Sequence, residues 1–129
     1  SELIKEVVVP EIESGSIVIS DRSAYSSIAY QGAGRELGVD KIFELNDIAL
    51  NGFWPEKVVL LDIDPKVSLQ RQKISDRIGS SETEFFQRVR QGYLNLAANY
   101  PEEFLVVEAE KEFSKNLDLI CDWLSIGKT

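Results

Sequence analysis

The residues best suited to chemistry lie in the polar stretch from Asp21 to Gly32. An Asp-Arg pair comes at the end of a short apolar run, after Ser20, and hydroxyl and amide side chains follow it. The planar guanidinium of Arg22 suits a phosphate group, and polar groups beside Tyr30 and Gln31 could read the edge of a heterocyclic base. An Asp21–Arg22 salt bridge followed by a helix with polar exposed faces explains the same composition, so the residue types alone leave both interpretations open.

Two further acids, Asp62 and Asp64, follow the apolar run from Val58 to Leu61. In open parallel sheets, ligands bind beyond the carboxyl ends of the strands, so acids at this position are candidates for function. Asp64 also directly precedes Pro65, and an Asp before a helix commonly caps it. We favour capping for Asp64.

The elements that must position these residues can be predicted from apolar patterns. Three continuous apolar runs predict strands covered on both faces. Helical spacing separates them, with Asp40 as the expected cap of one helix and Gly15 and Gly52 as stop signals. The alternation predicts an α/β fold with a parallel sheet in one domain over residues 1–129. The predicted strands cover 16–21, 57–62 and 104–108, and the predicted helices cover 3–14, 40–50, 65–73, 82–99 and 114–126.

Composition excludes several classes of protein. A net charge of −8 argues against broad nucleic-acid binding. No apolar run approaches the ~18 residues of a membrane span, and the first residues lack the pattern of a signal peptide. With no histidine and Cys121 as the single cysteine, zinc chemistry, Cys/His catalysis and an internal disulfide are not expected. We expect a cytoplasmic protein without membrane or nucleic-acid partners.

Taken in order, these segments closely resemble the thymidylate kinase family over nearly the whole chain, from about Leu3 to the last helix. The stretch from Asp21 to Gly32 matches the family's Asp-Arg pair, Ser-rich pair and Ala-Tyr-Gln-Gly. The resemblance implies a P-loop kinase-like parallel sheet flanked by helices, of which this chain would carry three of five core strands. Further matches in the right order are Glu44-Leu45-Asn46, Leu60 to Pro65, Arg71, Asp76-Arg77-Ile78 and Phe86 to Leu94.

The resemblance also implies an activity, namely transfer of the ATP γ-phosphate to dTMP, with magnesium, to give dTDP for dTTP synthesis. Arg22 would hold the 5′-phosphate of dTMP. Asp21 would orient Arg22 or reach the magnesium shell through water. Ser27, Tyr30 and Gln31 would surround the thymine base.

The ATP side of the site is implied in the same way. Arg71 and Arg77 would close over the ATP phosphates, with residues 74–82 as the lid, a loop that opens and closes. The loop from Glu108 to Lys111 would lie near adenine. Apart from the resemblance, we expect a homodimer or a larger self-association, because the apolar strands would otherwise expose large patches.

The sequence departs from the family in three places. Ser23 stands where an aromatic residue or His is usual, and Gly79 replaces a frequent Glu. No Gly-x-x-x-x-Gly-Lys-Ser/Thr occurs in the 129 residues, although that loop cradles the ATP phosphates. We therefore expect a fragment that is inactive alone, binds no metal and lacks its central strand. Either the 16–21 strand then moves beside the 57–62 strand, or another chain packs into the gap, and we favour self-association.

Two other hypotheses stay open. The first is a related nucleoside or nucleotide kinase of the same fold with another substrate, which a panel of nucleotides in a thermal-shift assay would distinguish. The second is a degenerate kinase retained for binding or dimer formation, which upstream sequence carrying a phosphate-binding loop would exclude.

Overall fold

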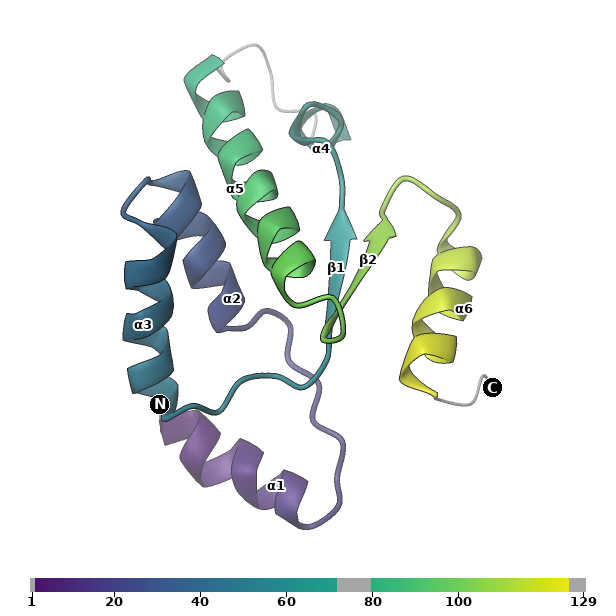
Figure 1. Ribbon diagram of the computed structural model, residues 1–129. Coiled ribbons are helices and arrows are strands. Elements are labelled where there is room, and N and C mark those ends of the chain that lie inside the picture. The colour runs from purple at the N-terminus through teal and green to yellow at the C-terminus, as the bar shows by residue number, and fades with distance from the viewer. Residues whose placement is uncertain (1, 72–79, 126–129) are drawn as a thin grey trace.

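Two parallel strands lie between two groups of helices in the computed structural model, which describes residues 2–71 and 80–125. The strands are β1 (Val58–Asp62) and β2 (Phe104–Glu108), paired in register from Val58 with Phe104 to Asp62 with Glu108. Figure 1 shows α2, α3 and α5 on one side of the strands and α6 on the other. The helices are η1 (Ile4–Val8), α1 (Val9–Glu13), α2 (Ala24–Ser27), η2 (Ile28–Gly34), α3 (Val39–Leu50), α4 (Pro65–Arg71), α5 (Ser80–Asn99) and α6 (Phe113–Leu124), with η1 and η2 of the π type.

The predicted α/β class and two of the three predicted strands are confirmed. The prediction of a strand over residues 16–21 is wrong. The segment is irregular, and the side chains of Ile17 and Ile19 are 79% and 87% exposed. A strand needs a neighbour to take up its backbone hydrogen bonds. Within the described residues the sheet consists of β1 and β2 alone, so the segment has not moved beside β1 either.

The predicted helix over residues 3–14 is two elements in direct succession, η1 and α1. Pro10 lies in the first turn of α1 and has no N–H to donate to the preceding turn in η1. Gly15 follows with a φ of +95°, which confirms it as the stop signal.

Helix α3 begins one residue earlier than predicted. Its N-cap is Gly38, and Asp40 lies in the first turn, so the prediction that Asp40 caps this helix is wrong. An acid in the first turn still interacts favourably with the positive end of the helix dipole. The helix ends at Leu50, and its C-cap Asn51 has a left-handed backbone conformation. Gly52 follows with a φ of +74°, which confirms it as the predicted stop signal.

The remaining helices agree with the prediction except at their ends. Helix α4 starts at Pro65, and the predicted residues 72–73 lie outside the described part of the chain. Helix α5 begins at Ser80, so residues 80–82 of the predicted 74–82 lid are helical, and the rest of it is not described. Helix α6 starts at Phe113, and residue 126 is not described.

An aromatic cluster forms the core between α2, α3 and the start of β2. The Tyr25 ring lies 4.8 Å from that of Trp54 and 5.0 Å from that of Phe104, measured between centroids. Phe43 stacks on Trp54 at 4.7 Å. Burial raises the pKa of Tyr25 above its ordinary value. This cluster anchors α2, and therefore the residues on either side of it, to the sheet.

Helix α5 packs closely on η2 because both carry small residues at the contact. A side chain added at Gly92 would place its Cβ atom 2.7 Å from the Cβ atom of Ala33 and 3.3 Å from the Cα atom of Ala29. Gly92 and Ala29 are both buried. The close approach sets how α5 lies against η2. None of the described helices is long and apolar enough to span a bilayer.

Candidate acceptor site

Arg22 is held in a strained backbone conformation just before α2. Its φ of +83° lies in the left-handed region, which costs a non-glycine residue on the order of 1 kcal/mol. Two serines fix the chain on either side of it. The Ser20 hydroxyl donates to the Arg22 carbonyl at 2.7 Å, and the Ser23 side chain caps α2 by accepting from the Tyr25 amide at 3.3 Å. Ser23 therefore has a local structural role at the position where it departs from the family pattern.

The Arg22 guanidinium lies over the Tyr30 ring, 5.0 Å from its centroid. Tyr93 of α5 stands edge-on to Tyr30 at 6.3 Å, and its hydroxyl donates to Ser26 at 2.8 Å. The pKa of Arg22 is raised above its ordinary value. The largest cause is hydrogen bonding with the Tyr93 side chain, and the second is the charge interaction with Tyr30. The two tyrosines thus place the charged guanidinium while the residue stays exposed.

Asp21 is exposed beside Arg22, and the ion pairs of the described residues do not join the two. Of the two interpretations that composition left open, the one based on an Asp21–Arg22 salt bridge is therefore wrong. Arg22 lies over the Tyr30 ring instead, and no carboxylate of the described residues is within ion-pair distance of its charge. An arginine in that state can bind an anion such as a phosphate.

The predicted base-reading residues follow on α2 and η2. Ser27 accepts a hydrogen bond from the Asn46 side chain of α3 at 3.3 Å, and Asn46 also donates to the Ile42 carbonyl at 2.8 Å. Gln31 is half-buried in η2, and its carbonyl accepts from the Leu37 amide at 3.1 Å. The helix continues to Gly34, so the alternative that Gln31 only caps a helix ending at Gly32 is wrong. Arg22, Ser27, Tyr30 and Gln31 therefore lie on one short continuous segment.

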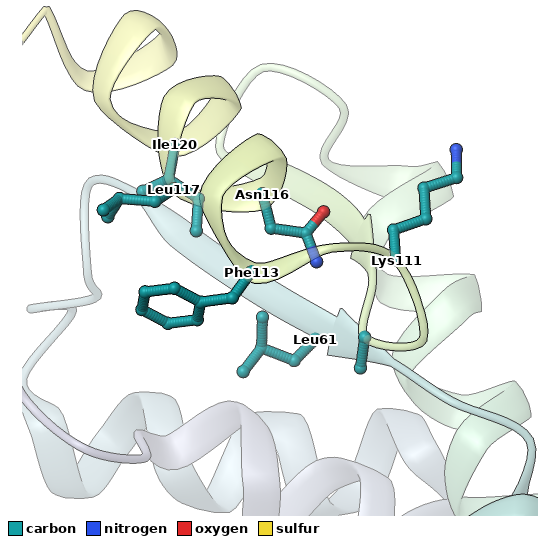
Figure 2. A pocket seen from close by; sticks show the side chains of 7 residues that line it. Leu61, Lys111, Phe113, Asn116, Leu117 and Ile120 are labelled. Carbon is teal, nitrogen blue, oxygen red and sulfur yellow. The ribbon is translucent and has the colours of Figure 1, made fainter.

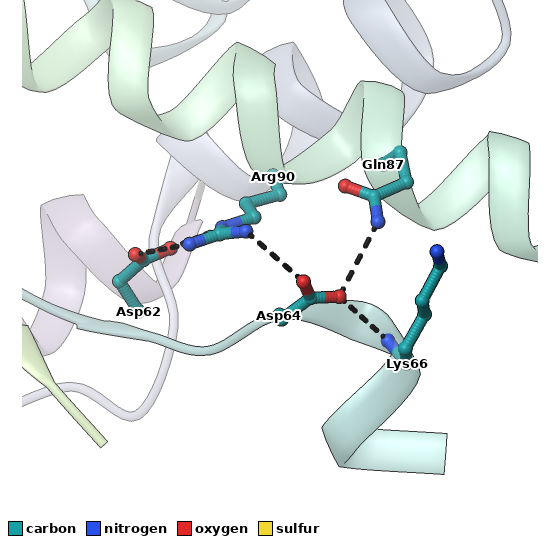
Figure 3. Close-up of polar contacts among 5 residues, drawn as sticks. All are labelled: Asp62, Asp64, Lys66, Gln87 and Arg90. Carbon is teal, nitrogen blue, oxygen red and sulfur yellow. Dashed lines mark hydrogen bonds and ion pairs between the residues drawn. The ribbon is translucent and has the colours of Figure 1, made fainter. Parts of the chain in front are cut away.

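The acids at the end of β1 bind an arginine (Figure 3). Arg90 of α5 donates to both carboxylate oxygens of Asp62, at 2.9 and 3.0 Å. Its Nη1 atom lies 3.9 Å from Asp64. Asp64 caps α4 by accepting from the Lys66 amide at 2.9 Å, which confirms the capping prediction. The contact with Asp62 raises the pKa of Arg90.

The chain does not assemble a magnesium site in the residues that the structure describes. No group of three or more acidic, His or Cys side chains is found there, and Asp62 is already neutralised by Arg90. Mg²⁺ needs a nearly octahedral shell of oxygen ligands. These residues therefore do not fit the ion by themselves.

The predicted ATP-side arginines are only partly covered by the structure. Arg71 is the last residue of α4, and Arg77 lies outside the described residues. The loop from Glu108 to Lys111 contributes Lys111 to an apolar pocket of about 230 Å³ between β1 and α6 (Figure 2). Asn116 lines this pocket as well, donating to the Glu108 carbonyl at 2.8 Å.

Three residues at the site were missed when it was predicted from sequence: Tyr93, Ser26 and Asn46. Each stands inside a segment that carries the family resemblance, which is the signal that could have found it. Their contacts join positions 19 and 67 residues apart along the chain. Such contacts depend on how α3 and α5 pack on η2.

Comparison with known proteins gives one consistent result. A family profile described as thymidylate kinase matches residues 1–120. Among similar curated proteins, the thymidylate kinase of Limosilactobacillus fermentum is 38% identical over 120 residues, covering 89% of this chain and 56% of the relative. That of Maridesulfovibrio salexigens is 42% identical over 118 residues, covering 84% and 54%. The chain thus spans about half the length of the relatives that it matches, and it belongs to the thymidylate kinase family.

Proposed function

We propose that the complete protein to which this chain belongs transfers the γ-phosphate of ATP to dTMP, giving dTDP for dTTP synthesis. The observation that carries the proposal is Arg22, an exposed cation with a strained backbone, which lies over the Tyr30 ring and has no carboxylate partner among the residues that the structure describes. Strain in a non-glycine residue persists where the surroundings impose it, and it is concentrated at functional sites. Membership of the family supplies the reaction.

Arg22 binds the 5′-phosphate of dTMP in this proposal. Its fork of N–H donors holds the acceptor phosphate in one orientation, which places the attacking oxygen for transfer. Phosphoryl transfer depends mainly on positioning and on stabilising charge, so a fixed arginine contributes directly to the rate. Asp21, exposed next to it, is the second catalytic candidate.

Ser27, Tyr30 and Gln31 surround the thymine base in the same proposal. The Asn46 amide donates to the Ser27 hydroxyl, which leaves the Ser27 proton available to an acceptor on the base. Gln31 offers both a donor and an acceptor, as the edge of a pyrimidine requires. Tyr30 links the two halves of the site because its ring also lies under Arg22.

ATP is proposed to bind at Arg71 and Arg77, with residues 74–82 as the lid and the loop from Glu108 to Lys111 near adenine. Magnesium would supply charge neutralisation on the ATP phosphates. Nothing proposed for the residues of this chain depends on the position of that ion.

A coupled ADP-release assay tests the proposal on two proteins. The complete protein is expected to turn over dTMP at about 1–100 s⁻¹, an ordinary rate for a kinase. The 129-residue chain is expected to show no turnover, since no phosphate-binding loop occurs in its sequence. Turnover by the complete protein with another nucleotide but not with dTMP would refute the substrate assignment, and a rate near background with every nucleotide would refute the activity.

We also propose that the protein self-associates, as a homodimer or a larger species, in the cytoplasm. Large apolar side chains are exposed on several elements, among them Ile17, Ile19 and Phe113 at 79%, 87% and 80%. Exposed apolar groups favour association when they form a contiguous patch. The free thiol of Cys121 is consistent with a reducing compartment.

A further inference from the structure

A network of one arginine, two aspartates and a glutamine joins three elements at the carboxyl end of β1. Arg90 of α5 donates two hydrogen bonds to the carboxylate of Asp62, the last residue of β1. Its Nη1 atom also lies 3.9 Å from the carboxylate of Asp64. Gln87, one turn earlier on α5, donates to Asp64 at 3.3 Å. Figure 3 shows the Arg90 and Gln87 side chains pointing from α5 toward the two acids.

Asp64 also accepts hydrogen bonds from the first turn of α4. Its side chain accepts from the Lys66 amide at 2.9 Å, and its carbonyl accepts from the Val67 and Ser68 amides at 3.0 Å each. The Lys66 amide is one of those that the first turn of a helix leaves without an internal partner, whereas the bond from Ser68 is the first hydrogen bond of the helix itself. The Asp64 carboxylate therefore holds the first turn of α4 through the Lys66 amide.

We propose that Arg90 is a positioning residue, which through Asp62 and Asp64 fixes the orientation of α4 and hence the place of Arg71 at its far end. The inference rests on the proposed function, in which Arg71 contacts the ATP phosphates. It assigns a role to Arg90, a residue outside the proposed acceptor and ATP sites.

The length of α4 determines how far a change in its orientation would move the backbone of Arg71. Its seven residues span about 9 Å from the first to the last Cα atom at 1.5 Å per residue. A tilt of about 10° at Asp64 would therefore move the Arg71 backbone by about 1.6 Å, and displacements of about 1 Å in a catalytic group can cost on the order of 100-fold in rate.

The fork of Arg90 suits this task better than a lysine would. Two parallel N–H···O bonds fix the angle between the guanidinium and the carboxylate as well as their distance. The site is also partly screened from water, with the Asp62 side chain 15% exposed and that of Arg90 32% exposed. A lysine would keep the charge and lose the angular control.

Amide hydrogen exchange on the 129-residue chain tests the anchoring directly. In Arg90→Lys, exchange at the Lys66 amide, whose N–H donates to the Asp64 carboxylate, is expected to accelerate about tenfold or more. Arg88→Lys is the matched control, because Arg88 lies on the same helix but donates to the Gly34 carbonyl at 2.9 Å. It should leave exchange at the Lys66 amide unchanged. Equal exchange in Arg90→Lys and the parent chain would overturn the proposal.

Steady-state kinetics on the complete protein test the consequence for Arg71. Arg90→Lys is expected to lower kcat about tenfold, while in an Arg71→Ala background the same change should lower it less than twofold. A full tenfold loss in both backgrounds would show that Arg90 does not act through Arg71, and would overturn the inference alone. An Arg71→Ala variant with unchanged kcat and KM for ATP would instead refute the proposed role of Arg71, and the exchange data would still decide the anchoring of α4.

Discussion

The contact between α5 and η2 can be tested by adding a single methyl group. In Gly92→Ala the new Cβ atom would lie 2.7 Å from the Cβ atom of Ala33, although ordinary contacts begin at 3.4 Å. It would also lie 3.3 Å from the Cα atom of Ala29. Both obstacles are attached directly to the backbone, so no side-chain rotation can relieve them. The two helices must move apart or distort.

Two contributions of opposite sign determine how much Gly92→Ala changes the free energy of unfolding. Overpacking a close contact costs about 1–3 kcal/mol, and the rigid neighbours of Gly92 place this site in the upper half of that range. Replacing glycine by alanine inside a helix stabilises the folded state by about 1 kcal/mol. The net loss in the free energy of unfolding is therefore about 1–2 kcal/mol. For a chain of 129 residues this corresponds to a fall in Tm of about 4–7 °C.

Thermal and urea unfolding of the 129-residue chain measure this loss. Gln91 is exposed on the same helix, so the difference between Gln91→Ala and Gln91→Gly isolates the helix-propensity effect at the neighbouring position. Adding Ala33→Gly to Gly92→Ala removes the shorter of the two contacts and should recover most of the stability. A Gly92→Ala chain as stable as the parent, or more stable, would refute the close packing of α5 on η2.

The acceptor site gives three further predictions, all for the complete protein. Arg22→Ala should cost on the order of 2–4 kcal/mol of transition-state stabilisation, with Arg22→Lys recovering only part, and kcat/KM within twofold of the parent would contradict the phosphate role. Tyr93→Phe removes the hydroxyl that donates to Ser26 and that raises the pKa of Arg22, and kcat/KM for dTMP should fall by a factor of about 3–10 with Tm little changed. Gln31→Ala should weaken dTMP binding by about 1–3 kcal/mol in calorimetry, and equal affinity would remove Gln31 from the base-binding wall.

Local signals were sufficient for the elements whose hydrogen bonds are local or whose apolar pattern is long. Helix α5 was predicted to within two residues at its start and confirmed at its end, at Asn99. The strand from Phe104 to Glu108 and the cap at Asp64 were predicted from residue type alone. Each of these depends on periodicity or on turn chemistry within a few residues.

The features that could not be predicted depend on distant partners. The segment over residues 16–21 has the apolar pattern of a strand, but a pattern cannot supply the neighbour that a strand needs. The close approach of Gly92 to Ala33 joins two helices, and nothing local marks it. Arg22 was recognised from its type and position, whereas Tyr93, 71 residues later, was found only through the packing of α5.

The exposed isoleucines of the 16–21 segment lead to a last prediction, on self-association. Ile17 and Ile19 are both exposed and lie two residues apart, so in a strand conformation their side chains would emerge on the same side. A second copy of the chain could bury them and supply the hydrogen-bond partners that a strand requires. The net charge of −8 opposes association, so the process should strengthen as salt rises from about 0.01 to 0.15 M and screens the repulsion.

Light scattering on the 129-residue chain should therefore give at least twice the monomer mass of 14.5 kDa. The double change Ile17→Ser and Ile19→Ser should shift the chain toward monomer. Leu119→Ser, at a side chain that is 53% exposed on α6, serves as the control and should have less effect. A parent chain that stays monomeric at every salt concentration would show that these isoleucines are tolerated in water. A loss of association in the control as large as in the double variant would instead place the contact on α6, because the apolar face of that helix would then be the surface that the copies share.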